Sequence, residues 1–335
     1  MNSIVLSALL PVTALIAFGF LLGRTRWLGP RMVKHLSDLA FLVLTPILLF
    51  RTMGKVHVEQ LDLKPAAAYI LALALVFAGM LVLRGLSRTS AVLALAATYS
   101  NAVMIGIPLV TLAWGDAGLV TLLTLIPVHS LLLLTSATLA LEFAVALEHR
   151  RAAPKGEIPQ CVAPRYPHEQ IAGTQVAGRM LRVAGRALRK ALIHPVPLPI
   201  VAGLLFAQTG LEIPAWIDQP MRWMGAAFGP LALALVGITL AGSAIGAQVR
   251  GALVMTGIKN LLVPALAALL GWAMGMRGLS FAVMVVTAAL PIGANVFMFS
   301  QRYGVAQQLV TASVAISTAF SAISVSLLLL LVAQL

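Results

Sequence analysis

Residues 100–108 read Ser-Asn-Ala-Val-Met-Ile-Gly-Ile-Pro, and residues 289–297 read Ala-Leu-Pro-Ile-Gly-Ala-Asn-Val-Phe. Each stretch places a proline, a glycine and an asparagine inside a segment that is otherwise apolar enough to cross a bilayer. Proline removes a backbone donor and clashes with the preceding turn, so each helix should open midway. Irregular backbone within hydrocarbon persists only where protein buries it or where it lines a polar cavity. The two stretches therefore predict two interrupted membrane helices.

The composition indicates an all-α polytopic membrane protein. The chain has 335 residues, of which 60% are hydrophobic and only 10% are charged, with a mean hydropathy of +0.99. A soluble domain carries about 25% charged residues, so this chain lacks the charge to cover a water-facing surface. We expect no cleaved signal peptide, because residues 1–3 carry no basic side chain. The net charge of +13 would suggest nucleic acid in a soluble protein. In a membrane protein the distribution of this charge indicates topology instead. We therefore expect lipid and no nucleic acid as a partner.

Apolar stretches of roughly the length needed to cross the hydrocarbon core recur along the whole chain. They predict ten transmembrane helices, at residues 4–22, 32–50, 66–83, 90–114, 119–146, 193–208, 221–245, 252–274, 279–300 and 307–332. Alternation of these helices gathers most of the 23 Lys and Arg residues, including those of the central loop, on one side. The positive-inside rule then places the central loop in the cytoplasm and both termini outside.

The chain divides into two halves of five helices each. We predict a first repeat at residues 1–147, a basic cytoplasmic loop at 148–190 and a second repeat at 191–335. An odd number of helices per half makes the second repeat inverted. Pro46 and Pro230 occupy corresponding positions and are interpreted as kinks. Inverted repeats with a matched pair of interrupted helices are typical of secondary transporters that work by alternating access. Residues 178–190 predict a basic interfacial helix, as an anchor or as a docking site.

The interrupted helices predict an anion site. The second half of each helix should begin near the membrane midplane, with Pro108 and Pro291 suited to its first turn. Free backbone donors and positive dipole ends would then converge on a negative group such as a carboxylate. The side-chain amides of Asn101 and Asn295 can add further donors. The predicted substrate-binding residues are Asn101, Ile107, Pro108, Pro291, Gly293 and Asn295.

Three ionisable residues within the predicted helices are candidates for coupling or for the transport pathway. Asp38 could take part in proton coupling or pair with Lys34 one turn away. His129 could titrate near neutral pH, or it could simply bond to a backbone carbonyl. Lys259 could snorkel to the interface or attract anions from the cytoplasm.

The sequence gives no support to an enzyme. The spans contain no paired aspartates, no His-Glu-x-x-His and no Gly-x-Ser-x-Gly, so we expect no catalytic residues. The single cysteine, Cys161, cannot build a metal site alone, and we expect neither a metal nor a cofactor. A sensor that recruits a partner through the basic loop is a further alternative, although that loop is too short for a recognisable signalling domain.

Several landmarks resemble the auxin efflux carrier family, which has bacterial members and plant PIN-type carriers. The matching positions are 44–50, Asn101 with 106–109, 229–233, Lys259 with Pro264, and 290–295 with Tyr303 and Gly304. The resemblance implies a fold similar to bile-acid/sodium symporters and NhaA-type antiporters. In that fold the first, second, sixth and seventh helices form a scaffold, often dimeric. The other six form a moving core, in which the fourth and ninth helices cross.

The same resemblance implies export or exchange of organic anions such as auxin, malate or malonate. The binding positions of the family carry over to Asn101, Pro108, Pro291 and Asn295. The short central loop is similar to that of bacterial members, which implies the bacterial inner membrane. We therefore predict a homodimeric secondary transporter or facilitator of small organic anions, moving as an elevator. The alternative is a sodium-coupled symporter of the bile-acid type; the coupling ion, proton or sodium, stays open.

Overall fold

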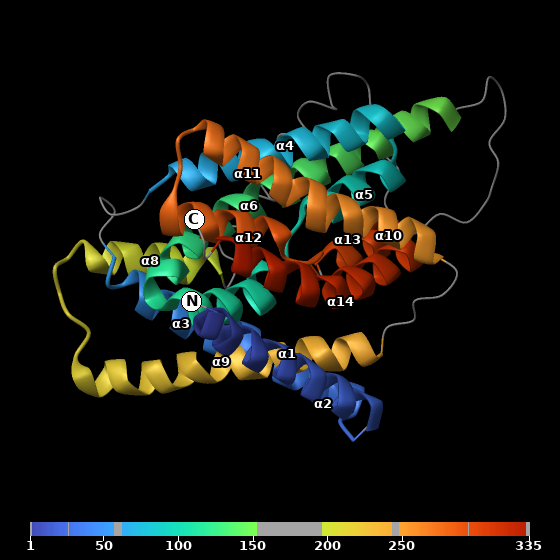
Figure 1. The fold of residues 1–335 in the computed structure, drawn as a ribbon. Coiled ribbons are helices and arrows are strands. Elements are labelled where there is room, and N and C mark those ends of the chain that lie inside the picture. The colour runs from blue at the N-terminus through green and yellow to red at the C-terminus, as the bar shows by residue number, and fades with distance from the viewer. Residues whose placement is uncertain are drawn as a thin grey trace.

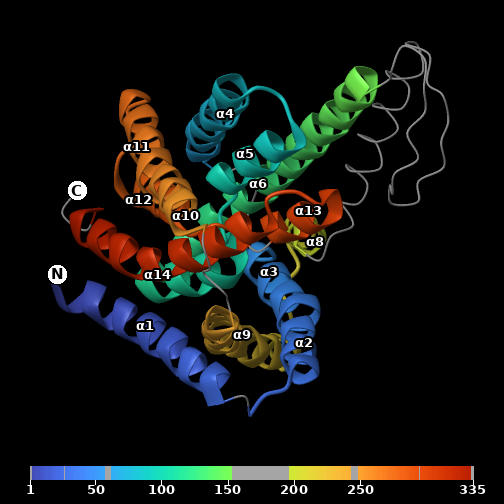
Figure 2. The same ribbon diagram turned by 90° about the vertical axis from the view of Figure 1, so that its right-hand side faces the viewer.

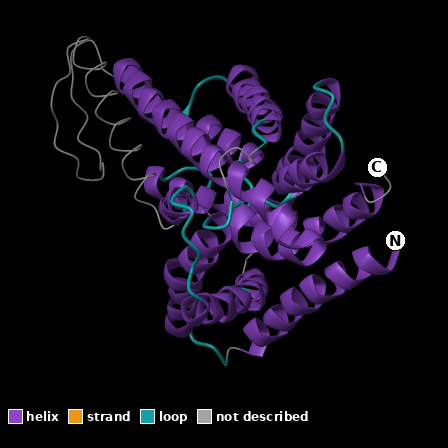
Figure 3. Cartoon of the chain, turned by 90° about the vertical axis from the view of Figure 1, so that its left-hand side faces the viewer, coloured by secondary structure: helices purple, strands orange, loops and turns teal. Residues whose placement is uncertain are grey.

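The computed structural model describes residues 2–25, 27–56, 62–152, 196–242, 248–293 and 295–332. Within these ranges the regular structure is helical, without a strand (Figure 3). The first half contains α1 (Asn2–Thr25), α2 (Pro30–Leu39), η1 (Ala40–Leu44), α3 (Thr45–Met53), α4 (Lys64–Arg84), α5 (Arg88–Thr98), η3 (Ala102–Gly106) and α6 (Ile107–Ala152). The second half contains α8 (Pro197–Ala207), α9 (Ala215–Ala241), α10 (Val249–Gly257), η5 (Ile258–Leu262), α11 (Val263–Ala273), α12 (Gly278–Ala289), α13 (Asn295–Tyr303) and α14 (Gln307–Val332). Cys161 and the predicted basic helix at 178–190 lie outside the described residues.

Six described helices are long and apolar enough to cross a membrane. They are Pro30–Met53, Lys64–Arg84, Ala102–Glu148, Ala215–Ala241, Val249–Ala273 and Gln307–Leu329. Three apolar helices are shorter: Pro11–Thr25, Leu198–Ala207 and Gly278–Ala289. The chain is thus a multi-pass membrane protein. The count of ten spans, the repeat boundaries and the orientation of the termini stay predictions.

Three prolines follow a widened, π-helical turn. Pro46 follows η1, Pro108 follows η3, and Pro264 follows η5, each as the second residue of the next α-helix. Proline cannot donate to the preceding turn and its ring crowds the carbonyl four residues earlier, which a wider turn relieves. The helix around Pro46 therefore runs on without interruption from Pro30 to Met53.

Several observed helix ends differ from the predicted ones. Within residues 90–114, where an interruption is predicted midway, the chain leaves helical structure between Thr98 and Ala102. Near the predicted gap at 115–118, Gly115 has non-helical φ/ψ (φ 61°, ψ −151°) that glycine tolerates, and the kink there separates the two helical parts of α6. The α6 helix continues to Ala152, beyond residue 147, and the boundary of the first repeat stays a prediction. The helix predicted at 221–245 starts earlier, at Ala215.

The helices pack as two groups. In Figures 1 and 2, α1 and α9 lie side by side, well apart from α4 and α11. The α1 and α9 main chains meet at Gly19 and Gly237, where a Cβ would lie 2.0 Å from a carbonyl of the other helix. The α12 helix contributes to both apolar clusters: Val283 and Val286 join the cluster with α9, whereas Val285 joins the cluster with α4. The C-terminal end of α12 therefore lies between the two groups.

Candidate functional site

The two interrupted segments lie against each other. Helical structure stops after Thr98 and resumes at Ala102, and it stops after Ala289 and resumes at Asn295. The N–H of Asn101 donates to the carbonyl of Pro291 at 2.8 Å, and the N–H of Gly293 donates to the carbonyl of Tyr99 at 2.9 Å. These bonds form an isolated antiparallel bridge centred on Ser100 and Ile292. Main-chain groups that a membrane would leave unpaired are therefore paired across the two breaks.

Each break contains a glycine whose lack of a side chain leaves room for a side chain of the other break. A Cβ on Gly293 would lie 2.6 Å from Cδ1 of Tyr99, and a Cβ on Gly106 would lie 2.7 Å from Cδ1 of Leu290. Separations this short force the neighbour to shift. Close approach of the two breaks therefore depends on both glycines.

A buried side-chain network supports the first break. The hydroxyl of Ser100 donates to the carbonyl of Thr287 at 3.0 Å, which leaves its oxygen to accept from Tyr69 Oη at 3.1 Å. The N–H of Ser100 donates to His129 Nε2 at 3.3 Å, so this nitrogen carries no proton. His129 Nδ1 then donates to Tyr69 Oη, also at 3.3 Å. The imidazole is held as a single neutral tautomer, and its partner is a backbone N–H rather than the expected carbonyl.

The two predicted asparagines are half-buried beside this network. Asn295 Nδ2 donates to Tyr99 Oη at 3.0 Å, and Ser130 Oγ lies 3.3 Å from the same hydroxyl. The Tyr99 ring also packs on the His129 ring, with centroids 4.6 Å apart. Asn295 is thus connected through Tyr99 to the opposite break. Asn101 contributes its main-chain N–H to the bridge, while its side chain is partly exposed.

The two prolines differ from each other in position. Pro108 is the second residue of α6, but the π turn η3 precedes α6, so helical structure already resumes at Ala102. Pro291 lies in the non-helical link, before α13 begins at Asn295. The other four predicted binding residues are all buried: Ile107, Pro108, Pro291 and Gly293. They therefore contribute to the packing of the breaks. Pro291 also contributes its carbonyl to the bridge, a role that a residue without an N–H can fill.

Lys259 extends into the protein. Its side chain is fully buried, and Nζ donates to the carbonyls of Ala288 at 2.6 Å and Leu290 at 2.8 Å. The neighbouring Asn260 donates through Nδ2 to the carbonyl of Ala289 at 2.9 Å. These carbonyls end α12, where no later N–H of the helix can reach them. The two side chains therefore cap α12 at the second break.

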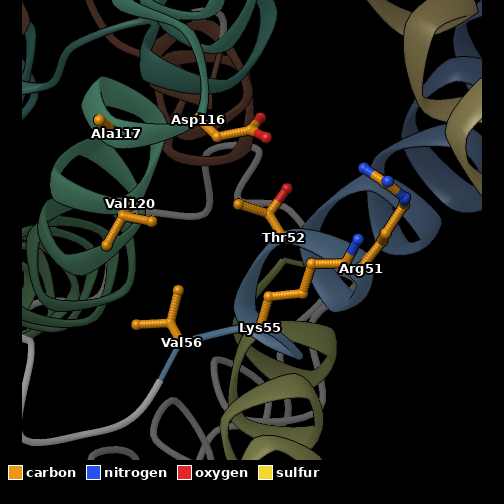
Figure 4. A pocket seen from close by; sticks show the side chains of 7 residues that line it. All are labelled: Arg51, Thr52, Lys55, Val56, Asp116, Ala117 and Val120. Atoms are coloured by element: carbon orange, nitrogen blue, oxygen red, sulfur yellow. The ribbon is translucent and has the colours of Figure 1, made fainter. Parts of the chain in front are cut away.

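Asp38 does not join this cluster. It is exposed on α2, and among the described residues no ion pair joins it to Lys34. A separate cavity of about 200 Å³ lies between α3 and α6, with Asp116 on one wall and Lys55 on the other (Figure 4). Arg51, beside that cavity, forms a two-bond ion pair with Asp218 of α9. Both features lie outside the hydrogen-bonded network of the breaks.

Three side chains at the breaks escape prediction from sequence: Tyr69, Tyr99 and Asn260. The two tyrosines carried a usable signal, because the chain has only 4 tyrosines and these two fall in apolar stretches. A buried tyrosine normally finds a partner for its hydroxyl. Thr287 acts through its backbone carbonyl, which no side-chain pattern reveals.

A family model described as membrane transport protein matches residues 4–329, nearly the whole chain. The chain belongs to this family, which is that of the auxin efflux carriers. This chain is 26% identical over 336 residues to a Rhizobium meliloti (strain 1021) protein provisionally named a malonate transporter. The match covers 96% of this chain and 94% of the relative. The chain is 23% identical to auxin efflux carrier component 8 of Arabidopsis thaliana, over 64% of this chain and 63% of the relative. An uncharacterized transporter of Methanothermobacter thermautotrophicus is 26% identical over 42% of this chain and 47% of its own length. The predicted family is confirmed, and the protein is a transporter rather than an enzyme.

Proposed function

We propose that this membrane transport protein carries small carboxylates across the bacterial inner membrane by alternating access. The substrate carboxylate binds where the two breaks meet. The observation that carries this proposal is the antiparallel bridge, because it brings the start of η3 and the start of α13 to one place. The first N–H groups of a helix have no earlier carbonyl in that helix and favour an anion.

The charges around the bridge favour the same ligand. The side chains that bond to the described residues of the breaks are neutral, as in His129 and Tyr69, or basic, as in Lys259. Among the described residues none of these bonds comes from a carboxylate, so nothing in this network repels an anion. The partly exposed amide of Asn101 can donate to one carboxylate oxygen, and the amide of Asn295 can donate to the other.

The relatives point to the class of substrate. Malonate is a dicarboxylate, and the relative provisionally named for its transport matches this chain over nearly its full length. In the proposed cycle ten spans form a 5+5 inverted repeat, in which the two interrupted helices cross. The group with α1, α3 and α9 serves as the dimeric scaffold, and the group with α4, α5 and α11 moves as an elevator. Both termini then lie outside.

Uptake of labelled malonate into proteoliposomes tests the site. We expect Asn101→Ala and Asn295→Ala each to weaken binding by about tenfold or more, since a hydrogen bond to a charged group contributes about 1.5–3 kcal/mol. Gln301→Ala is the matched control, because Gln301 is an exposed amide on the same helix as Asn295. Unchanged malonate binding in both asparagine variants, with folded protein, would refute the proposed site.

A further inference from the structure

The second break carries a buried ammonium group whose hydrogen-bond partners among the described residues are backbone oxygens. Lys259 Nζ lies 2.6 Å from the Ala288 oxygen and 2.8 Å from the Leu290 oxygen. The side chain is 0% exposed, although it begins in the middle of an apolar helix. Burying such a group is costly, so the surrounding oxygens must compensate for the water it loses.

These oxygens resemble the surroundings of a bound cation. The carbonyls of Ala288 and Leu290 belong to the C-terminal end of α12, where the helix dipole is negative. Ends of interrupted helices and unwound carbonyls are the groups with which transporters coordinate a coupling cation. Here the lysine side chain brings a cation to the same kind of position.

Two further oxygens are available on the helix that carries Lys259. Asn260 Oδ1 and Thr256 Oγ1 are both buried and have no hydrogen-bond partner among the described residues. They lie four residues apart, and therefore on one side of that helix. Buried polar atoms are rarely left without a partner. Together with the two carbonyls they are candidate ligands for an alkali cation.

We propose that Lys259 is a tethered cation that fills a monovalent-cation site at the second break, so that carboxylate binding requires no dissolved sodium. This inference rests on the proposed function, because it assigns the charge that complements the bound carboxylate. It also distinguishes the predicted transporter or facilitator from the sodium-coupled alternative, because a sodium-coupled symporter would need that position for its ion. Among the described residues no carboxylate bonds to Lys259, so no acidic partner cancels the charge that the substrate meets.

Two substitutions separate the charge of Lys259 from its volume. Lys259→Met fills the space with an unbranched neutral chain, whereas Lys259→Ala leaves room for an ion among the same oxygens. Lys64→Ala is the matched control, since Lys64 is exposed at the start of α4. Binding of labelled malonate to detergent-purified protein is measured in sodium chloride and in choline chloride at equal ionic strength, with thermal unfolding followed in the same two salts.

We expect the wild type and Lys64→Ala to bind malonate equally in both salts. Lys259→Met should bind about tenfold more weakly in both, since one nearby charge is removed. Lys259→Ala should be equally weak in choline and should recover affinity and thermal stability in sodium. The inference is wrong if wild-type binding requires sodium, or if Lys259→Met binds as the wild type does. It is also wrong if folded Lys259→Ala has the same malonate affinity and thermal stability in sodium as in choline. Failure of the carboxylate site itself would appear differently, as wild-type protein that binds malonate in neither salt.

Discussion

The N–H of Asn101 donates a 2.8 Å hydrogen bond to the carbonyl of Pro291, which lies 190 positions further along the chain. The reciprocal bond from Gly293 to Tyr99 makes the contact a two-bond bridge. Neither break can move without the other unless these bonds are lost, and in a membrane no water replaces them. The two breaks should therefore behave as one rigid unit that carries the substrate site.

The contact between Gly293 and Tyr99 predicts that Gly293→Ala is strongly destabilising. The added methyl group would lie 2.6 Å from a carbon of the Tyr99 ring, and the ring is itself held by Asn295 and by packing on His129. Forcing a methyl group into a packed core costs about 1–3 kcal/mol. We expect a lower unfolding temperature and weakened malonate binding together, measured by thermal unfolding and labelled-ligand binding on one preparation.

Gly79→Ala is the control for that substitution. Gly79 lies within α4, and a Cβ there would have no heavy atom within 4 Å. Alanine at such a helical position should leave stability unchanged or raise it by up to about 1 kcal/mol. Equal effects of the two substitutions would show that the breaks tolerate separation and are not one rigid unit.

The tautomer of His129 predicts which replacements the first break accepts. His129→Phe fills the space but removes the acceptor of the Ser100 N–H, and an unpaired buried donor costs about 1–3 kcal/mol. We expect His129→Gln, which can keep an acceptor, to retain more stability than His129→Phe in thermal unfolding. His35→Gln on the exposed face of α2 should change nothing. If His129→Phe unfolds at the wild-type temperature, the proposed network does not hold the break in place.

Much of the helical architecture could be predicted from hydropathy, because a bilayer-spanning helix must be apolar over about 20 residues. Ends of helices were less predictable, as at Ala215, where α9 begins six residues before the predicted start at Met221. Proline marked both breaks but not their limits. The π-helical turn before Pro108 and the non-helical link around Pro291 move those limits away from the prolines themselves.

The site was partly predictable for a similar reason. Asn101 and Asn295 stand out as amides in apolar segments, whereas the pairing of Tyr99 with Gly293 joins positions that no spacing relates. Lys259 shows the limit most clearly. A lysine two turns into a helix can extend to the interface or turn inward, and the choice depends on helix rotation. Only the folded chain places the α12 carbonyls within reach of its ammonium group.

The ion pair of Arg51 with Asp218 predicts a measurable coupling between α3 and α9. Arg51 donates through Nε at 2.8 Å and through Nη2 at 3.0 Å, and the two side chains are only 15% and 23% exposed. A two-bond pair at this depth should give a coupling energy of about 1 kcal/mol in a double-mutant cycle of Arg51→Ala and Asp218→Ala. The matched control is the pair of Arg88 with Glu148, whose side chains are 41% and 40% exposed, and there we expect only a few tenths of a kcal/mol. Unfolding by SDS titration in mixed micelles measures both cycles. Coupling no larger at Asp218 than at Glu148 would mean that this pair does not join the two helices, and that packing and the contact of Lys55 with Asp218 hold α3 on α9.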